Sequence, residues 1–396
     1  MTFKPGDCLR EVCSDLLEAL GPPGTQHQNE SCFQSWKPIT DSSDNRTSVG
    51  VGEGLLRECL DGLMQSEAIG QRERSDWTEG VLRGLQALAD EQINSIDFHM
   101  VPTRWLALYT DVSLARALRR LWFIDAANDS KQRSVDALEA VRLLDMALII
   151  AGGCGEGRLS WIHQTIRCAQ AFLAAPQDKD DDVAHGDRPS KRRKVAAGVD
   201  PDPSILFAPK HVPVLPRPPT VSAYTSRHSE SPFVLRQFTT SGHGCPTWDA
   251  ISKWSDPTYI LSCVGEGRHV PVEIGSAYSD RNWGQRIVHL REFLTQAGFF
   301  GNQNDDREDG SKESPMYLAQ HSLFRQFPQL ERDIALPDYV WSAPSPPADY
   351  PTYAPPSNRE GVITNVWIGS GSSTIVSPAH TVRRDSSNAM REATDQ

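Results

Sequence analysis

Two glycine clusters have the composition of a loop that cradles phosphate. They are Gly50-Val-Gly52-Glu-Gly54 and Gly152-Gly-Cys-Gly-Glu-Gly157, and each adjoins a segment with helical periodicity. A phosphate loop also needs a buried strand before it, and a Lys-Ser/Thr pair or a ribose-binding acid after it. Neither cluster has these partners. We therefore expect glycines that terminate helices, and no nucleotide site.

The eight cysteines form no metal-binding or disulfide pattern. They stand at positions 8, 13, 32, 59, 154, 168, 245 and 263, and no two make a Cys-x-x-Cys pair. This spacing argues against a zinc ribbon and against a disulfide scaffold, so we expect free thiols in a reducing compartment. The N-terminal residues do not resemble a signal peptide, and no stretch approaches eighteen apolar residues. We therefore expect an intracellular protein without a membrane segment.

A basic tetrad, Lys191-Arg192-Arg193-Lys194, follows Pro189-Ser190 in a polar stretch. An import receptor needs such a cluster in an exposed segment, so we expect this tetrad to direct the chain to the nucleus, with the cytoplasm as the alternative. The formal net charge of −11 argues against binding nucleic acid through the net field of the protein. Four charges alone would bind DNA weakly, and we expect no direct nucleic-acid partner.

Short sequence phrases in the C-terminal half occur in a characteristic order. They are Trp254-Ser-Asp-Pro-Thr-Tyr-Ile-Leu261, Val270-Pro-Val-Glu-Ile-Gly-Ser-Ala-Tyr278, Trp283-Gly-Gln285, Phe293-Leu294, Tyr317-Leu-Ala-Gln-His-Ser-Leu-Phe324, Pro328-Gln-Leu-Glu-Arg-Asp-Ile334, Pro337-Asp-Tyr339, Asn365-Val-Trp367 and Ser377-Pro-Ala-His380. Together they resemble the JmjC-domain proteins of the lysine demethylase 8 (arginyl-hydroxylase) group. The resemblance covers about residues 232–380. Its specificity lies in the order and spacing of the phrases.

The resemblance implies a double-stranded β-helix, the cupin fold, that holds Fe(II) and 2-oxoglutarate. Two histidines and a carboxylate on one face would leave open positions on the iron for 2-oxoglutarate and O₂. The family's first ligands form a His-x-Asp pair on one strand. His380 matches the histidine, but Val382 stands where the family has Asp and cannot bind iron.

A substitute carboxylate is poorly placed in the sequence. Asp385 is five residues from His380, which in a strand is the opposite face and about 16 Å away. The family's second histidine and a lysine for 2-oxoglutarate come from a later stretch that has no match here. The resemblance therefore implies an incomplete iron site. An imperfect gene model or a truncated allele would explain the abrupt loss of similarity better than a pseudo-enzyme, which would more often keep its sheet.

Other pocket positions are carried over by the same resemblance. Tyr317 matches a tyrosine that reaches the 2-oxoglutarate carboxylate, Ser377 matches a second contact to it, and Gln320 matches a polar group facing the site. Asn365 and Trp367 match residues on the strand that enters the pocket. Each also has a structural interpretation, since Trp367 would suit a core and Tyr317 would pack with its hydroxyl bonded.

The elements that must position these residues form two domains joined by a linker. Residues 1–175 carry apolar residues at three- and four-residue spacing in six helix-length windows, separated at 21–52 by a polar loop, and predict a helical domain. Residues 176–231 contain acidic, basic and proline-rich runs and predict a disordered linker. Residues 232–380 predict a partial JmjC domain with strands at 270–274 and 362–368 and helices at 283–294 and 318–326. The tail 381–396 matches nothing.

We therefore expect an α+β chain with an all-α N-terminal domain and an incomplete cupin domain. The family activity is hydroxylation of a protein or demethylation of a histone lysine, and we expect this chain to lack it because the iron site is incomplete. The alternative is a nuclear scaffold that acts through its helical half, with a passive cupin remnant. Expected partners are a protein or histone substrate in the family and an import receptor for the basic tetrad.

Overall fold

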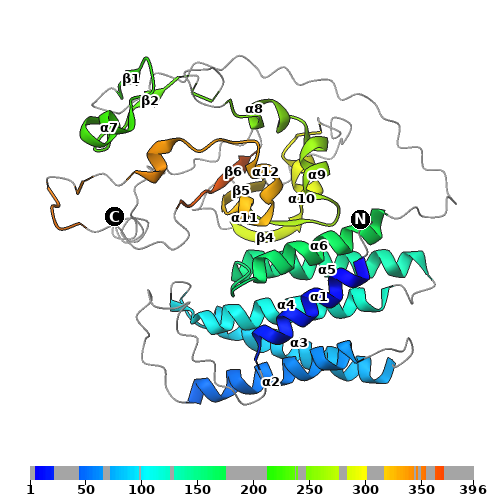
Figure 1. Cartoon of the computed structure of the whole chain (residues 1–396). Coiled ribbons are helices and arrows are strands. Elements are labelled where there is room, and N and C mark those ends of the chain that lie inside the picture. The colour runs from blue at the N-terminus through cyan, green and yellow to red at the C-terminus, as the bar shows by residue number, and fades with distance from the viewer. Residues whose placement is uncertain are drawn as a thin grey trace.

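The computed structural model describes residues 5–21, 44–65, 72–97, 100–124, 129–174, 212–236, 238–239, 247–275, 283–300, 316–342, 345–346, 349–353 and 362–369. A bundle of helices α1–α6 lies on one side, and a unit with a four-stranded sheet lies on the other (Figure 1). Each part has a hydrophobic core of its own. Within the described part of the chain, no helix combines the length and apolar character needed to span a membrane.

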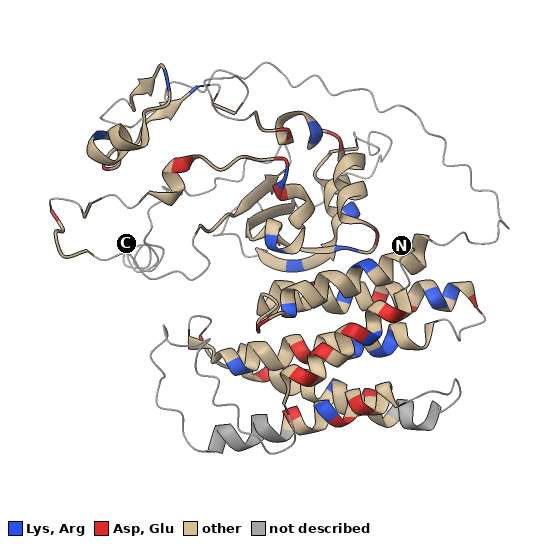
Figure 2. Cartoon of the chain, in the orientation of Figure 1, with Lys and Arg blue, Asp and Glu red and all other residues tan. Residues whose placement is uncertain are grey.

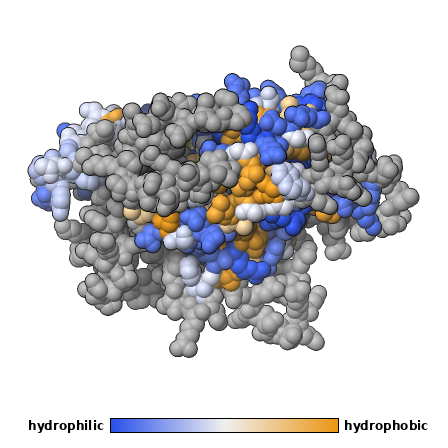
Figure 3. Space-filling view, turned by 90° about the horizontal axis from the view of Figure 1, so that it is seen from below, coloured by the Kyte–Doolittle hydropathy of each residue, from blue (hydrophilic) through white to orange (hydrophobic). Residues whose placement is uncertain are grey.

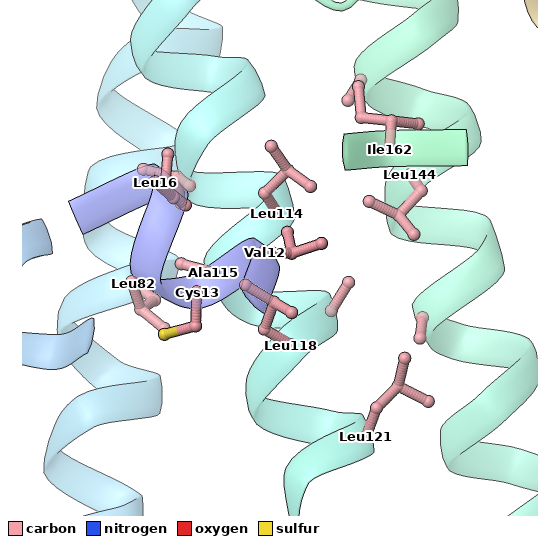
Figure 4. Close-up of a cluster of buried hydrophobic side chains, with 14 of the residues drawn as sticks. Val12, Cys13, Leu16, Leu82, Leu114, Ala115, Leu118, Leu121, Leu144 and Ile162 are labelled. Atoms are coloured by element: carbon pink, nitrogen blue, oxygen red, sulfur yellow. The ribbon is translucent and has the colours of Figure 1, made fainter. Parts of the chain in front are cut away.

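The bundle is built around its fourth helix. Its members are α1 Pro5–Ala19, α2 Asp44–Met64, α3 Arg72–Asn94, α4 Thr103–Trp122, α5 Ser130–Ala151 and α6 Arg158–Ala174. Helix α4 contacts all five others. Its Leu114, Leu118 and Leu121 recur at helical spacing and are fully buried. Figure 4 shows them with Val12, Cys13 and Leu16 of α1, Leu82 of α3, Leu144 of α5 and Ile162 of α6.

The two glycine clusters have structural roles in the helices. The expectation that the first cluster precedes a helix, after a loop at 21–52, is wrong, because α2 already begins at Asp44 and runs through it. Gly52 faces Leu85 and Leu108 at close range. The second cluster follows α5 as expected. Gly152 is its left-handed C-cap, with φ of 64°, and its N–H bonds to carbonyl oxygens of the last turns.

The sheet is antiparallel, with strand order β4-β3-β5-β6. Its strands are β3 His269–Ile274, β4 Gly284–His289, β5 Met316–His321 and β6 Val366–Gly369. The alternate residues Val270 and Val272 of β3 are buried, with Leu318 of β5 on the same face. They pack against the helices α9 Pro257–Val264, α10 Leu290–Gln296, α11 Leu323–Gln326 and α12 Pro328–Glu331. The expected mixture of strands and helices is present in this unit, and strands β3–β6 form one open sheet.

Two segments predicted to be helical contain strands. Residues 284–289 form β4, because pairing with β3 over six residues prevails over the helical spacing, and a helix begins only at Leu290. Residues 316–321 form β5, followed by the short helix α11. Residues 316–319 of β5 alternate between buried and half-buried positions, whereas in β4 Val288 is the buried residue and its neighbours are exposed or half-buried.

Part of the predicted linker is folded. Residues 212–231 contain the short strand β1 Val214–Leu215, helix α7 Val221–Ala223 and a π-helical turn, Tyr224–His228. Strand β1 pairs in parallel with β2 Val234–Leu235. Two more short helices, α8 Ala250–Lys253 and the 3₁₀ turn Asp338–Trp341, flank the sheet unit. Residues 212–231 of the predicted linker therefore contain ordered secondary structure.

Both signs of charge are interspersed over the bundle (Figure 2). One cluster joins α3 to α4, where Glu79 accepts hydrogen bonds from Arg116 and Arg119 at 3.0 Å each. Viewed from below, hydrophobic residues gather among hydrophilic ones on one face of the molecule (Figure 3). The described helices of the bundle thus carry interspersed charges of both signs.

Candidate functional site

The predicted pocket residues fall in two groups. Tyr317 and Gln320 lie on β5, Asn365 lies directly before β6, and Trp367 lies in β6. Ser377, His380, Val382 and Asp385 lie outside the described residues, as does the basic tetrad Lys191–Lys194. The structure therefore places the strand residues of the candidate site and leaves its expected iron ligand untested.

Three of the four placed residues share one face of the sheet. Tyr317 is opposite Glu273 of β3 and Gly369 of β6, whereas its neighbour Leu318 is opposite Ile368 on the apolar core face. Because side chains alternate along a strand, Tyr317 points to the face opposite the core. Trp367 and Asn365 point the same way, since Ile368 and Val366 pack in the core. We call this side, with Glu273, Tyr317, Asn365 and Trp367, the pocket face.

The pocket face is accessible in the described structure. Trp367 is 41% exposed, so it is not a core residue as its size would suggest. Tyr317 is half-buried, and Asn365 is exposed and accepts a long hydrogen bond from Ser322 Oγ at 3.5 Å. Large aromatic side chains on an accessible sheet face are suited to packing against a ligand or a further strand.

Gln320 is placed by an irregularity in β5. The register with β6 shifts between Leu318 and His321, so β5 carries one residue more than its partner. Gln320 has φ of 51° and is exposed. It is the non-glycine residue with a positive φ in the described chain. The bulge changes the alternation, so that His321 lies opposite Val366 of the core face.

The pocket face supplies part of what a bound 2-oxoglutarate would need. Tyr317 offers a hydroxyl and Asn365 an amide, both of which can bond a carboxylate. Among the described strands, however, this face carries no Lys or Arg, and Glu273 next to Tyr317 adds a negative charge. The described residues thus fit the hydrogen-bonding part of such a site and not its charge.

The iron site is not formed by the described residues. Within that part of the chain, no three His, Cys, Asp or Glu side chains come together closely enough to hold a metal ion. The expected ligand, His380, lies in the part that the structure does not describe. The geometry therefore supports no reaction step through a metal.

The second glycine cluster lines a cleft where the α5–α6 turn meets α11. The cleft has a volume of about 740 Å³ and lies between the α5–α6 turn and α11. Arg325 of α11 lines it, and its Nε donates a hydrogen bond to the Gly152 carbonyl at 2.7 Å. The glycines here let the chain turn and approach its neighbours closely, because Gly153, Gly155 and Gly157 also have positive φ.

Sequence reasoning missed a group of hydrogen-bonded polar residues in the sheet unit. Asp333, only 3% exposed, accepts hydrogen bonds from Lys253 Nζ, Trp254 Nε1 and Tyr259 Oη at 2.8–3.0 Å. Burial alone would raise the pKa of Asp333, but these hydrogen bonds hold it below its ordinary value. Trp254, Tyr259 and Asp333 belong to the phrases that carry the family resemblance. Their membership in these phrases is the sequence signal that could have indicated this group.

Comparisons with known proteins place this sequence among relatives of one kind. It is 42% identical over 92 residues to Jumonji C domain-containing protein 5 of Drosophila melanogaster, which covers 23% of this chain and 21% of that protein. It is 35% identical over 133 residues to lysine-specific demethylase 8 of Xenopus tropicalis, covering 34% and 24%. No family model matches the chain.

A third relative extends the similarity beyond the C-terminal unit. Lysine-specific demethylase 8 of Danio rerio is 27% identical over 246 residues, which covers 61% of this chain and 51% of that protein. This is more than the sequence from residue 232 onward can supply, so the match reaches into the preceding part. Across these relatives the chain spans between about a fifth and a half of their length.

Proposed function

This chain belongs to the JmjC-domain family, and we propose that its C-terminal unit has the plan of a JmjC 2-oxoglutarate oxygenase without the ability to catalyse oxidation. The observation that supports the plan is the pocket face, which gathers Tyr317, Asn365 and Trp367 on one side of the sheet. The observation that argues against catalysis is Val382, an apolar residue where the family has the carboxylate ligand.

The family activity defines what is lost. In the family, Fe(II) and 2-oxoglutarate together supply oxidation of a C–H bond on a protein side chain. Three ligands on one face of the iron are needed to leave room for 2-oxoglutarate and O₂. With valine at one of these positions, His380 would hold a metal ion weakly. By analogy with relatives named lysine-specific demethylases, the substrate class of this unit would be a protein lysine side chain.

The test is calorimetric titration of Mn(II), a redox-stable substitute for Fe(II), into the full chain with and without 2-oxoglutarate. We expect no binding in the micromolar range. The variant Val382→Asp restores the family's His-x-Asp pair, and we expect it to bind Mn(II) measurably. Micromolar binding by the natural sequence that disappears in His380→Ala would show that another group completes the site, and the proposal would be wrong.

We propose further that the chain acts in the nucleus. The basic tetrad Lys191–Lys194 and the resemblance to lysine-specific demethylases support this location. Replacing the four basic residues with alanine in a fluorescent fusion should abolish nuclear accumulation. Replacing Asp180, Asp181 and Asp182 with alanine is the matched control in the same stretch. An unchanged distribution of the tetrad variant would contradict the proposal.

A nuclear scaffold is the second candidate function. It is favoured by one observation: helices α1–α6 enclose a core separate from that of the sheet, so they present a stable surface of their own. A chain without turnover would still perform this role. If the chain turned over 2-oxoglutarate and this turnover depended on His380, the sheet unit would be catalytic. The scaffold proposal, in which the sheet unit is passive, would then be excluded.

A further inference from the structure

A fully buried carboxylate connects the bundle to the sheet. Asp145 of α5 has 0% of its surface exposed. Its Oδ1 accepts hydrogen bonds from Arg268 Nη2 at 2.7 Å and from Gln326 Nε2 at 2.8 Å, and its Oδ2 accepts one from the His269 backbone N–H at 2.8 Å. A buried charge is tolerated only when it is paired and fully hydrogen-bonded. Here the partners come from the start of β3 and from α11, more than a hundred residues away.

Gln326 extends this network to β5. Its Nε2 donates to Asp145 and to the His269 carbonyl at 2.7 Å, and its Oε1 lies 2.6 Å from His321 Nε2. Both amide hydrogens are thus used, so Oε1 must accept and His321 must donate from Nε2. Burial lowers the pKa of His321 below its ordinary value, which keeps the ring neutral. A single Nε2–H tautomer follows from the arrangement.

His321 lies at the C-terminal end of β5. It is the last residue of the strand, pairs with Val366 of β6, and directly follows the bulge at Gln320. Tyr317 lies four residues earlier on the same strand. A hydrogen-bonded chain therefore runs from a helix of the bundle through Asp145, Gln326 and His321 to the part of the sheet that carries the pocket face.

Neighbouring contacts hold α11 against the bundle. The Arg325 carbonyl lies 3.0 Å from His163 Nε2 of α6, and Arg325 Nε bonds the Gly152 carbonyl. The Arg268 guanidinium lies 4.5 Å from the ring centre of Phe327 and bonds the Gln326 carbonyl at 3.2 Å. Helix α11 is thus fixed from both sides, and a shift of α5 would be passed to it rather than absorbed.

We propose that Asp145 is a positioning residue for the pocket face, and that the bundle controls the end of β5 through the chain Asp145–Gln326–His321. The interpretation of the pocket face as a ligand site rests on the proposed function. The coupling between α5 and β5 does not depend on it. A partner or a modification that displaces α5 would then alter the pocket face without touching it.

The coupling is tested in the full chain by hydrogen exchange of the β5 amides and by the ring ¹⁵N shifts of His321. In Asp145→Asn we expect exchange across residues 316–321 to be about tenfold faster, and His321 to lose its single Nε2–H tautomer. The matched control is Asp111→Asn, which removes a carboxylate that is 5% exposed and paired with Arg158 inside the bundle. We expect this control to leave β5 exchange and the His321 tautomer unchanged.

Two outcomes would overturn the proposal. Equal acceleration of β5 exchange in both variants would mean general destabilisation, and an unchanged His321 tautomer in Asp145→Asn would mean no coupling. Should Asp145→Asn fail to fold, Gln326→Ala decides, because it breaks the chain without leaving a buried charge unpaired. In Gln326→Ala, faster amide exchange of residues 316–321 with unchanged amide exchange of α5 supports the coupling. Unchanged exchange in both segments contradicts it. Neither readout needs a metal or 2-oxoglutarate, so failure here is distinct from failure of the proposed function.

Discussion

Buried carboxylates hold this protein together at separate places. Asp111 joins α4 to the start of α6, Asp145 joins the bundle to the sheet unit, and Asp333 gathers the loops around α8 and α9. Each is at most 5% exposed and accepts at least two hydrogen bonds. Sequence patterns give no warning of such residues, because an acidic residue in a helix or loop normally predicts an exposed position. Their roles emerge only from the tertiary contacts.

Asp333 gives the sharpest stability prediction among them. Replacing Asp333 with Asn removes the charge that three donors share, and we expect a loss of about 2–3 kcal/mol in the free energy of unfolding. The control is Asp249→Asn, whose 59% exposed side chain pairs with the same Lys253. This exposed pair should contribute no more than about 1 kcal/mol. Urea unfolding of both variants measures the difference, and equal losses would contradict this role of Asp333.

His163 predicts how stability depends on pH. Burial is the main cause that lowers the pKa of His163 to about 4, from an ordinary value of 6.5. The unfolded chain therefore binds a proton at a higher pH than the folded chain does, so stability falls as the pH drops from about 6.5 to about 4. In His163→Gln, whose amide can still donate to the Arg325 carbonyl, this part of the pH dependence should disappear. Urea unfolding at pH 4.5, 5.5 and 7 checks it, and an unchanged slope would refute the assignment.

At the scale of elements, strand β5 combines regular pairing with one strained position. Gln320 has φ of 51°, a region where β-branched residues are rare and glycine is unstrained. We expect Gln320→Val to be less stable than Gln320→Gly by roughly 1–2 kcal/mol. Ala319→Val is the control, since it adds the same kind of side chain one residue earlier, where the described backbone has a negative φ. Thermal or urea unfolding measures the stability of each variant. Equal free energies of unfolding for Gln320→Val and Gln320→Gly would contradict the positive φ at this position.

Helices were easier to predict than strands for a physical reason. The apolar spacing in α4, α5 and α6 is a local signal that persists over many turns, and the expected windows agree with the observed helices. Strand β4 lacks such a signal, since Ile287 and Leu290 suggest a helix until pairing with β3 is known. The faces of Tyr317 and Trp367 likewise depend on register, which no single segment encodes.

At the scale of the whole molecule, several polar contacts and one close backbone approach join the bundle to the sheet unit. Gln170 of α6 donates hydrogen bonds to the Val264 and Glu266 carbonyls at 3.0 and 2.9 Å, beside the Asp145 network. Gly267 approaches Leu138 of α5 so closely that a Cβ would lie 2.8 Å from it. The sequence predicted two parts and a linker. It did not predict the contacts between the bundle and the sheet unit, because the residues that make them are far apart in the sequence.

The family assignment could be predicted from short phrases, whereas the expected loss of activity rests on the incomplete iron site that the resemblance implies. Tyr317, Asn365 and Trp367 share one face of the sheet, and Trp367 is exposed rather than packed in the core. Their contacts to 2-oxoglutarate stay a prediction. Valine at residue 382 removes one of the iron ligands that the resemblance implies. Whether this chain is active is settled by turnover.

The most direct measurement is release of succinate from 2-oxoglutarate by the purified full chain, supplied with Fe(II), ascorbate and O₂. The account predicts no release above a protein-free control, because valine at position 382 removes a carboxylate ligand that the chemistry requires. Release of succinate by the natural sequence that is abolished in His380→Ala would contradict it and would restore the chain to the active members of its family.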